Sequence, residues 1–135
     1  MTVRSLLFAT LVSAALASGA TAQTEGGAPP PPAEAPYDEG LSRLAEILGA
    51  MHYLRELCGA GEGTLWRDQM QGLIDAEQAG GPRLDRLVDA FNRGYEGFKA
   101  VYRACTPAAT TAIDRYMAEG ARIARDVAAR YGREE

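Results

Sequence analysis

The apolar residues between Leu84 and Cys105 recur every three or four positions, and this pattern constrains the fold more than any other feature of the sequence. Spacing of this kind places side chains on one face of an α-helix. No segment alternates between apolar and polar residues for long enough to predict a β-strand. The sequence therefore predicts an all-α protein with a long helix over residues 84–105. Its apolar face comprises Leu84, Leu87, Val88, Phe91, Tyr95, Phe98, Tyr102 and Cys105.

Three more stretches show the same periodicity, at about residues 41–58, 65–78 and 107–131. Gly59 follows the first stretch, and glycine commonly ends a helix. Pro82 lies just before the helix predicted over 84–105, and Pro107 begins the stretch at 107–131. Proline suits the first turn of a helix. Because the connections are short, we predict a small four-helix bundle whose helices run alternately up and down.

The two cysteines of the chain, Cys58 and Cys105, fall at the C-terminal ends of the first and third predicted helices. Those two helices run in the same direction in an up-and-down bundle, so both cysteines are expected at the same end of it. An oxidising compartment favours a disulfide there, which would contribute roughly 4 kcal/mol to stability. The alternative is a redox-active pair, which usually has a Cys-x-x-Cys spacing that is absent here. We predict a structural disulfide.

Residues 1–22 have the pattern of a secretory signal peptide. Arg4 supplies the positive charge, residues 6–16 form an apolar run too short to span a bilayer, and Ala20 and Ala22 suit a signal peptidase. The alternative is a buried N-terminal helix. Cleavage near Ala22 and Gln23 would leave a chain without a membrane anchor, so we expect a periplasmic or secreted protein.

Residues 23–36 are rich in proline and glycine and are expected to form a disordered linker. The run Pro29–Pro32 favours an extended polyproline II conformation. It would serve as a spacer or, alternatively, as a ligand for an aromatic-lined groove. Residues 37–132 would then form the helical bundle domain, followed by a tail at 133–135.

Composition and motifs exclude several classes of function. Hydrophobic residues make up 47% of the 135 residues and charged residues 24%, as in a globular protein. A net charge of −4 and a pI near 5.1 argue against nucleic-acid binding, which needs concentrated positive charge. His52 is the only histidine, and neither a heme-attachment motif nor paired Glu-x-x-His motifs accompany it. Without a nucleophile motif either, we expect no metal, no cofactor and no catalytic residues, hence no enzyme.

A group of polar and aromatic side chains forms the candidate binding surface, since such residues commonly anchor protein or glycan contacts. Alternatively, they pack at helix edges. The group consists of Trp66, Arg67, Asn92, Arg93, Tyr95 and Tyr102. Glycines inside the predicted helices would permit close helix approach or, alternatively, leave room for a ligand. These glycines are Gly49, Gly72, Gly94, Gly97 and Gly120. The charges of the last helix alternate in sign and predict a solvated, salt-bridged face. They are Arg115, Glu119, Arg122, Asp126 and Arg130.

Several segments resemble a family of small exported alphaproteobacterial proteins of unknown function. They include Arg43–Gly49 (RLAEILG), His52–Arg55 (HYLR), Phe91–Tyr95 (FNRGY) and Cys105–Ala108 (CTPA). The resemblance implies a compartment and a fold type, and no activity. Two interpretations follow. The first is a non-enzymatic interaction or accessory module with a protein partner in the cell envelope. The second is a carrier that holds a small ligand or cofactor between the helices, using the aromatic residues and His52. The sequence alone indicates no oligomeric state.

Overall fold

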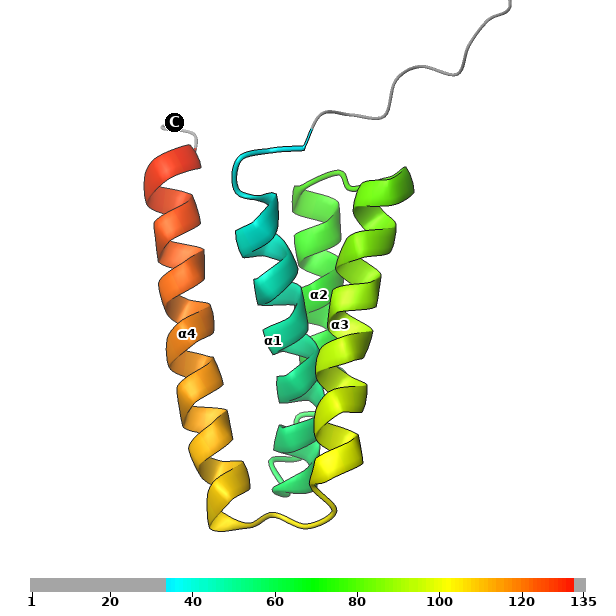
Figure 1. The fold of residues 1–135 in the computed structure, drawn as a ribbon, viewed down its shortest axis with the longest axis vertical. Helices are drawn as coiled ribbons and strands as arrows, with labels where there is room; N and C mark the ends of the chain where they lie inside the picture. The colour runs from blue at the N-terminus through cyan, green and yellow to red at the C-terminus, as the bar shows by residue number, and fades with distance from the viewer. Residues whose placement is uncertain (1–33, 133–135) are drawn as a thin grey trace, which may run out of the picture.

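The computed structural model describes residues 34–132, which form four helices. These are α1 (Asp38–Leu57), α2 (Leu65–Ala76), α3 (Gly81–Val101) and α4 (Pro107–Tyr131), and the described residues contain no strand. The helices run alternately down and up (Figure 1), which confirms the predicted four-helix bundle. The predicted signal peptide, the proline run and the C-terminal tail lie outside the described residues. No described helix is both long and apolar enough to cross a membrane.

Helix α1 is the centre of the bundle and contacts each of the other three helices. Figure 1 shows α3 running parallel to α1 on one side, with α4 on the other side and α2 behind. Within the described part of the chain, no Cα atom of α4 comes within 8 Å of one in α2 or α3. Helix α4 therefore packs mainly on α1, and its contact with α3 is made by side chains, since the rings of Phe98 and Tyr116 lie 5.1 Å apart.

The crossing of α1 and α3 depends on two buried glycines. A Cβ atom built on Gly49 would lie 1.9 Å from the carbonyl oxygen of Phe91, and one on Gly94 would lie 1.9 Å from that of Glu46. Ala45 and Ala90 precede these glycines by four residues and are fully buried. The predicted close approach of helices is confirmed at these glycines.

At the other three helical glycines, no backbone atom of another helix occupies the Cβ position. A Cβ atom on Gly120 of α4 would lie 3.3 Å from the side chain of Ile47, so this glycine also permits close packing against α1. Gly72 and Gly97 have no atom within 4 Å of such a Cβ position. Packing within the described chain therefore does not explain these two residues.

The core consists of two clusters, and α1 contributes to both. The cluster between α1 and α4 contains Ile47, Ala50, Met51, Leu54, Ala109, Ile113 and Ile123. The cluster between α1, α2 and α3 contains Leu41, Ala45, Met70, Leu87 and Ala90. Opposite sides of one helix thus supply the apolar surface on which the other three helices pack.

Helix α3 ends at Val101, so the prediction that it continues to Cys105 is wrong at this end. Tyr102 has an extended backbone, and its carbonyl oxygen accepts a hydrogen bond from the hydroxyl of Tyr53. Thr106 caps α4 by accepting a hydrogen bond from the backbone N–H of Ala109 at 3.2 Å. Because α4 begins directly after this cap, the chain must reverse between α3 and Thr106, which ends α3 early.

The reversal places Cys105 beside Cys58, with their Cα atoms 4.9 Å apart, and the predicted disulfide between these residues is confirmed. The bridge closes a loop of 47 residues and ties the connection before α4 to the C-terminal end of α1.

Candidate functional site

The six residues of the predicted binding surface are divided among separate places on the molecule. Arg67 and Tyr95 line a cleft beside His52. Arg93 and Tyr102 line a different groove, next to Gly97 and Val101. The two remaining residues, Trp66 and Asn92, lie in neither of these places.

Trp66 is half-buried against the core cluster between α1 and α4. Its indole N–H donates a hydrogen bond to Glu62 at 2.6 Å, and the same carboxylate holds Arg55. These contacts fix the orientation of the Trp66 side chain on α2. Asn92 is exposed on α3.

The cleft beside His52 has a volume of about 460 Å³, and we call it the His52 cleft. Its lining residues are His52, Tyr53, Glu56, Leu57, Gly63, Thr64, Arg67 and Tyr95. The ring of Tyr95 lies 5.5 Å from the rings of both His52 and Tyr53. Burial and the nearby charge of Arg67 lower the pKa of His52, so its imidazole is neutral at pH 7. The cleft thus combines aromatic rings with one cation and one carboxylate.

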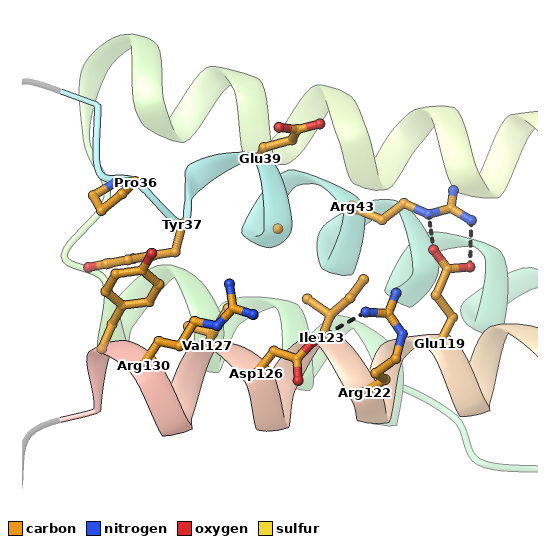
Figure 2. Close-up of a pocket in the computed structure, with 12 residues that line it drawn as sticks. Pro36, Tyr37, Glu39, Arg43, Glu119, Arg122, Ile123, Asp126, Val127 and Arg130 are labelled. Carbon is orange, nitrogen blue, oxygen red and sulfur yellow. Dashed lines mark hydrogen bonds and ion pairs between the residues drawn. The ribbon is translucent and has the colours of Figure 1, made fainter.

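A second groove lies between the start of α1 and the end of α4, and Figure 2 shows it. We call it the α1–α4 groove; its volume is about 330 Å³. Its lining residues are Pro36, Tyr37, Glu39, Gly40, Arg43, Glu119, Arg122, Ile123, Asp126, Val127, Arg130 and Tyr131. Gly40, Ile123 and Val127 pack together, because a Cβ atom on Gly40 would lie 3.6 Å from both other side chains.

Charged pairs form one end of the α1–α4 groove. Arg43 donates two hydrogen bonds to Glu119, from Nε at 2.8 Å and from a terminal nitrogen at 2.9 Å. This contact lowers the pKa of Glu119. The guanidinium of Arg43 also lies 4.9 Å from the ring centre of Tyr116. Arg122 and Asp126 form a further pair at 3.2 Å, drawn as a dashed line in Figure 2.

Two tyrosines form the other end of the groove. The rings of Tyr37 and Tyr131 lie 5.0 Å apart, and 44% of Tyr131 is exposed. Arg130 of α4 also lines the groove, and Figure 2 shows its guanidinium group reaching toward the space between α1 and α4. The groove therefore offers arginine and tyrosine side chains around an apolar floor.

Sequence reasoning missed this groove because its key contact joins residues 76 positions apart. The alternating charges of α4 predicted a solvated face, and the exposed pair Arg122–Asp126 agrees with that expectation. Glu119 instead binds Arg43 on another helix. The position of Glu119 between Tyr116 and Ile123, at the edge of the apolar face of α4, was the one feature of the sequence that indicated a contact with another helix.

The described residues contain no group of three or more His, Cys, Asp or Glu side chains placed to hold a metal ion. No curated protein and no solved structure matches the chain. Residues 36–131 match the family model described as "Protein of unknown function (DUF2385)". This match spans all four helices and most of the sequence. The chain therefore belongs to the DUF2385 family of proteins of unknown function.

Proposed function

We propose that this protein is exported and works in the cell envelope as a non-enzymatic module that binds a protein partner through the α1–α4 groove. The observation that carries the proposal is the composition of the groove. Five of its lining residues are arginine or tyrosine: Tyr37, Arg43, Arg122, Arg130 and Tyr131. These residue types are enriched among the side chains that contribute most to protein–protein affinity.

Several of these side chains are held in place before a partner arrives. Glu119 fixes Arg43 through two hydrogen bonds, and Tyr37 packs against Tyr131. Binding a partner would therefore cost these side chains little conformational entropy, which favours affinity. Arg130 and the exposed part of Tyr131 are the accessible groups that a partner would contact first.

Export is supported by the N-terminal sequence pattern and by the disulfide. Disulfides persist in oxidising compartments such as the bacterial periplasm. The bridge between Cys58 and Cys105 suits that environment. Export is tested by fractionating cells and measuring the intact mass of the purified chain. The expected product begins near Gln23, weighs two hydrogens less than the reduced chain and is found in the envelope fraction. A full-length product confined to the cytoplasm would contradict this part of the proposal.

Partner binding is tested in cells by replacing Tyr131 with a photoreactive phenylalanine analogue. Irradiation should give a defined adduct with one envelope protein. The matched control places the same analogue at Arg125, an exposed position of α4 outside the groove. With the identified partner, Arg130→Ala should weaken binding about tenfold, and Arg125→Ala should leave it unchanged. An identical adduct from both positions, or equal affinity of both variants, would exclude the groove as the contact.

The His52 cleft favours a second candidate function, a carrier of a small ligand. Its volume of about 460 Å³ lies in the range of small-molecule sites, and three rings together with Arg67 border it. Native mass spectrometry of protein purified from the envelope tests this function. A carrier would retain an additional mass that leaves on denaturation and is lost in Tyr95→Ala. Protein that carries no additional mass would exclude this function.

A further inference from the structure

A groove between α3 and α4, which we call the α3–α4 groove, has no part in the proposed function. Its volume is about 370 Å³. It is lined mainly by α3, with Tyr116 from α4 and Glu46 from α1, and Figure 1 shows α3 and α4 on either side of α1. The α3 side of the groove is open, because Gly97 has no atom within 4 Å of its Cβ position and 72% of Val101 is exposed.

Three half-buried aromatic rings line this groove. The rings of Phe98 and Tyr102 are stacked, with their centres 5.8 Å apart and 16° between their planes. The ring of Tyr116 stands at 87° to that of Phe98, with the two centres 5.1 Å apart. Grooves lined by aromatic rings are the surfaces that bind proline-rich segments in the polyproline II conformation.

The polar groups of the groove also suit a run of prolines. Proline has no backbone N–H, and polyproline II has no internal hydrogen bonds, so such a run offers carbonyl oxygens that need donors. The guanidinium of Arg93 and the hydroxyl of Tyr102 can donate to them. Glu46 is the one carboxylate among the lining residues, and Arg43 binds it at 3.1 Å. The groove therefore combines aromatic rings with hydrogen-bond donors.

The start of the described chain contacts α3 on the flank that leads into this groove. Glu34 forms an ion pair with Arg86 of α3 at 2.6 Å. Arg93 follows Arg86 by seven residues and Gly97 follows it by eleven, so the three residues share one flank of α3. The residues that precede Glu34 therefore start from one end of this flank, and the α3–α4 groove lies farther along it.

The proline run of residues 29–32 has the length needed to reach the groove. At about 3.1 Å per residue in polyproline II, Pro32 would lie about 6 Å from Glu34 and Pro29 about 16 Å from it. At about 1.5 Å per residue along α3, Arg93 lies about 11 Å beyond Arg86 and Gly97 about 17 Å beyond it. We propose that this run, which lies outside the described residues, binds the α3–α4 groove of its own chain.

Covalent attachment and charge both favour this occupant. A short linker holds the run at an effective concentration in the millimolar range, so a contact with a Kd below that value is mostly occupied. Residues 23–36 contain two carboxylates, Glu25 and Glu34, and no basic residue. Arg86 and Arg93 lie along the flank of α3 that the segment would follow, so the charges of the two are complementary.

NMR spectroscopy of the intact protein tests this proposal. The comparison is a serine variant that combines Pro29→Ser, Pro30→Ser, Pro31→Ser and Pro32→Ser. The backbone amide signals of Arg93 and Gly97 should differ between the two proteins, whereas that of Tyr95, which lines the His52 cleft on the other flank of α3, should not. The difference should be the same at about 50 µM and about 1 mM protein, because a contact within one chain does not depend on concentration.

A free peptide with the sequence of residues 23–33 (QTEGGAPPPPA) provides a second measurement. It should bind the serine variant at the groove, and the intact protein at least threefold more weakly, because the attached run competes. Adding Arg93→Ala to the serine variant should weaken peptide binding about fivefold, since a donor is lost. Lys99→Ala is the matched control, because Lys99 is an exposed cation of α3 that lies over the ring of Tyr95 instead.

Four outcomes would overturn the proposal. Identical amide signals in the intact protein and the serine variant would show that the run does not contact the groove. A difference that grows with protein concentration would assign the groove to the proline run of a second copy. Equal affinity of the peptide for both proteins would leave the groove to a proline-rich segment of another protein. Equal weakening by Arg93→Ala and Lys99→Ala would place the peptide elsewhere on α3.

Discussion

At the scale of single residues, the glycines show what a sequence can and cannot predict. Helical periodicity identified five glycines as unusual, but all five have the same local sequence cost. Only the structure separates Gly49 and Gly94, where another backbone occupies the Cβ position, from Gly72 and Gly97, where space is open. The difference arises from contacts between segments distant in sequence, and no local pattern records those contacts.

This distinction gives a paired prediction on α3. Gly94→Ala places a Cβ atom 1.9 Å from the backbone oxygen of Glu46, so α1 and α3 must move apart. We expect the free energy of unfolding to fall by at least about 2 kcal/mol. Gly97→Ala introduces the same methyl group into open space three residues later and should raise stability by about 0.5–1 kcal/mol. Urea denaturation monitored by circular dichroism measures both. A similar effect of the two substitutions would contradict the packing account.

At the scale of elements, Arg83 joins the ends of three helices. It contacts Asp38 at the start of α1 at 2.6 Å and Glu77 after the end of α2 at 2.8 Å, while belonging to the first turn of α3. Burial alone would raise the pKa of Asp38, but the hydrogen bonds from Arg83 and Ala35 lower it on balance. Periodicity predicted these helices, but not this contact between their ends.

We predict that Arg83→Met lowers the free energy of unfolding at pH 7 by about 2 kcal/mol. The substitution removes the cation that binds both carboxylates and leaves Asp38 only its 4.0 Å contact with Arg86. The pair is only partly buried, with 17% of Arg83 and 12% of Asp38 exposed, so the loss is smaller than for a fully buried pair. Arg122→Met is the control, since its pair with Asp126 is 60% and 50% exposed and should be worth less than about 0.5 kcal/mol. An equal loss of unfolding free energy in both variants would show that burial of the ion pair does not determine its contribution to stability.

The same variant predicts a dependence on pH. The native pKa of Asp38 is lower than its unfolded value, so its ion pair stabilises the fold above the unfolded pKa of about 3.9. That contribution is lost as the pH falls through the native pKa. The stability difference between the unmodified protein and Arg83→Met should therefore be full at pH 7 and shrink below about pH 4. Denaturation curves between pH 7 and pH 2 measure it, and a constant difference would assign the effect to packing by the Arg83 side chain instead.

At the scale of the whole molecule, the sequence predicted the fold class, the direction of the helices and the disulfide. It did not predict that α4 packs mainly on α1, because an apolar face indicates that a helix is buried and not which neighbour buries it. The location of the α1–α4 groove depends on that choice. The six predicted binding residues also separate, because residues of one helix point to different sides of it. Tyr95 of α3 lines the His52 cleft, whereas Arg93 of the same helix lines the groove next to Gly97 and Val101.

The attachment of α4 leads to a final prediction about how the molecule opens. Helix α4 packs mainly on one neighbour, α1, and the disulfide ties the connection before α4 to α1. A bridge closing 47 residues contributes about 4 kcal/mol, so reduction, Cys58→Ser or Cys105→Ser should each lower the melting temperature by more than about 10 °C.

Loss of the bridge should not affect all helices equally. Local opening occurs first where an element has few buried contacts, so hydrogen exchange in the reduced protein should accelerate most in α4. Exchange in α1 and α3 should change less, because their crossing at Gly49 and Gly94 does not involve the bridge. Uniform acceleration in all four helices would instead show that α4 unfolds only together with the rest. In that case the α1–α4 groove would be as rigid as the core, and a partner would meet a surface that is already formed.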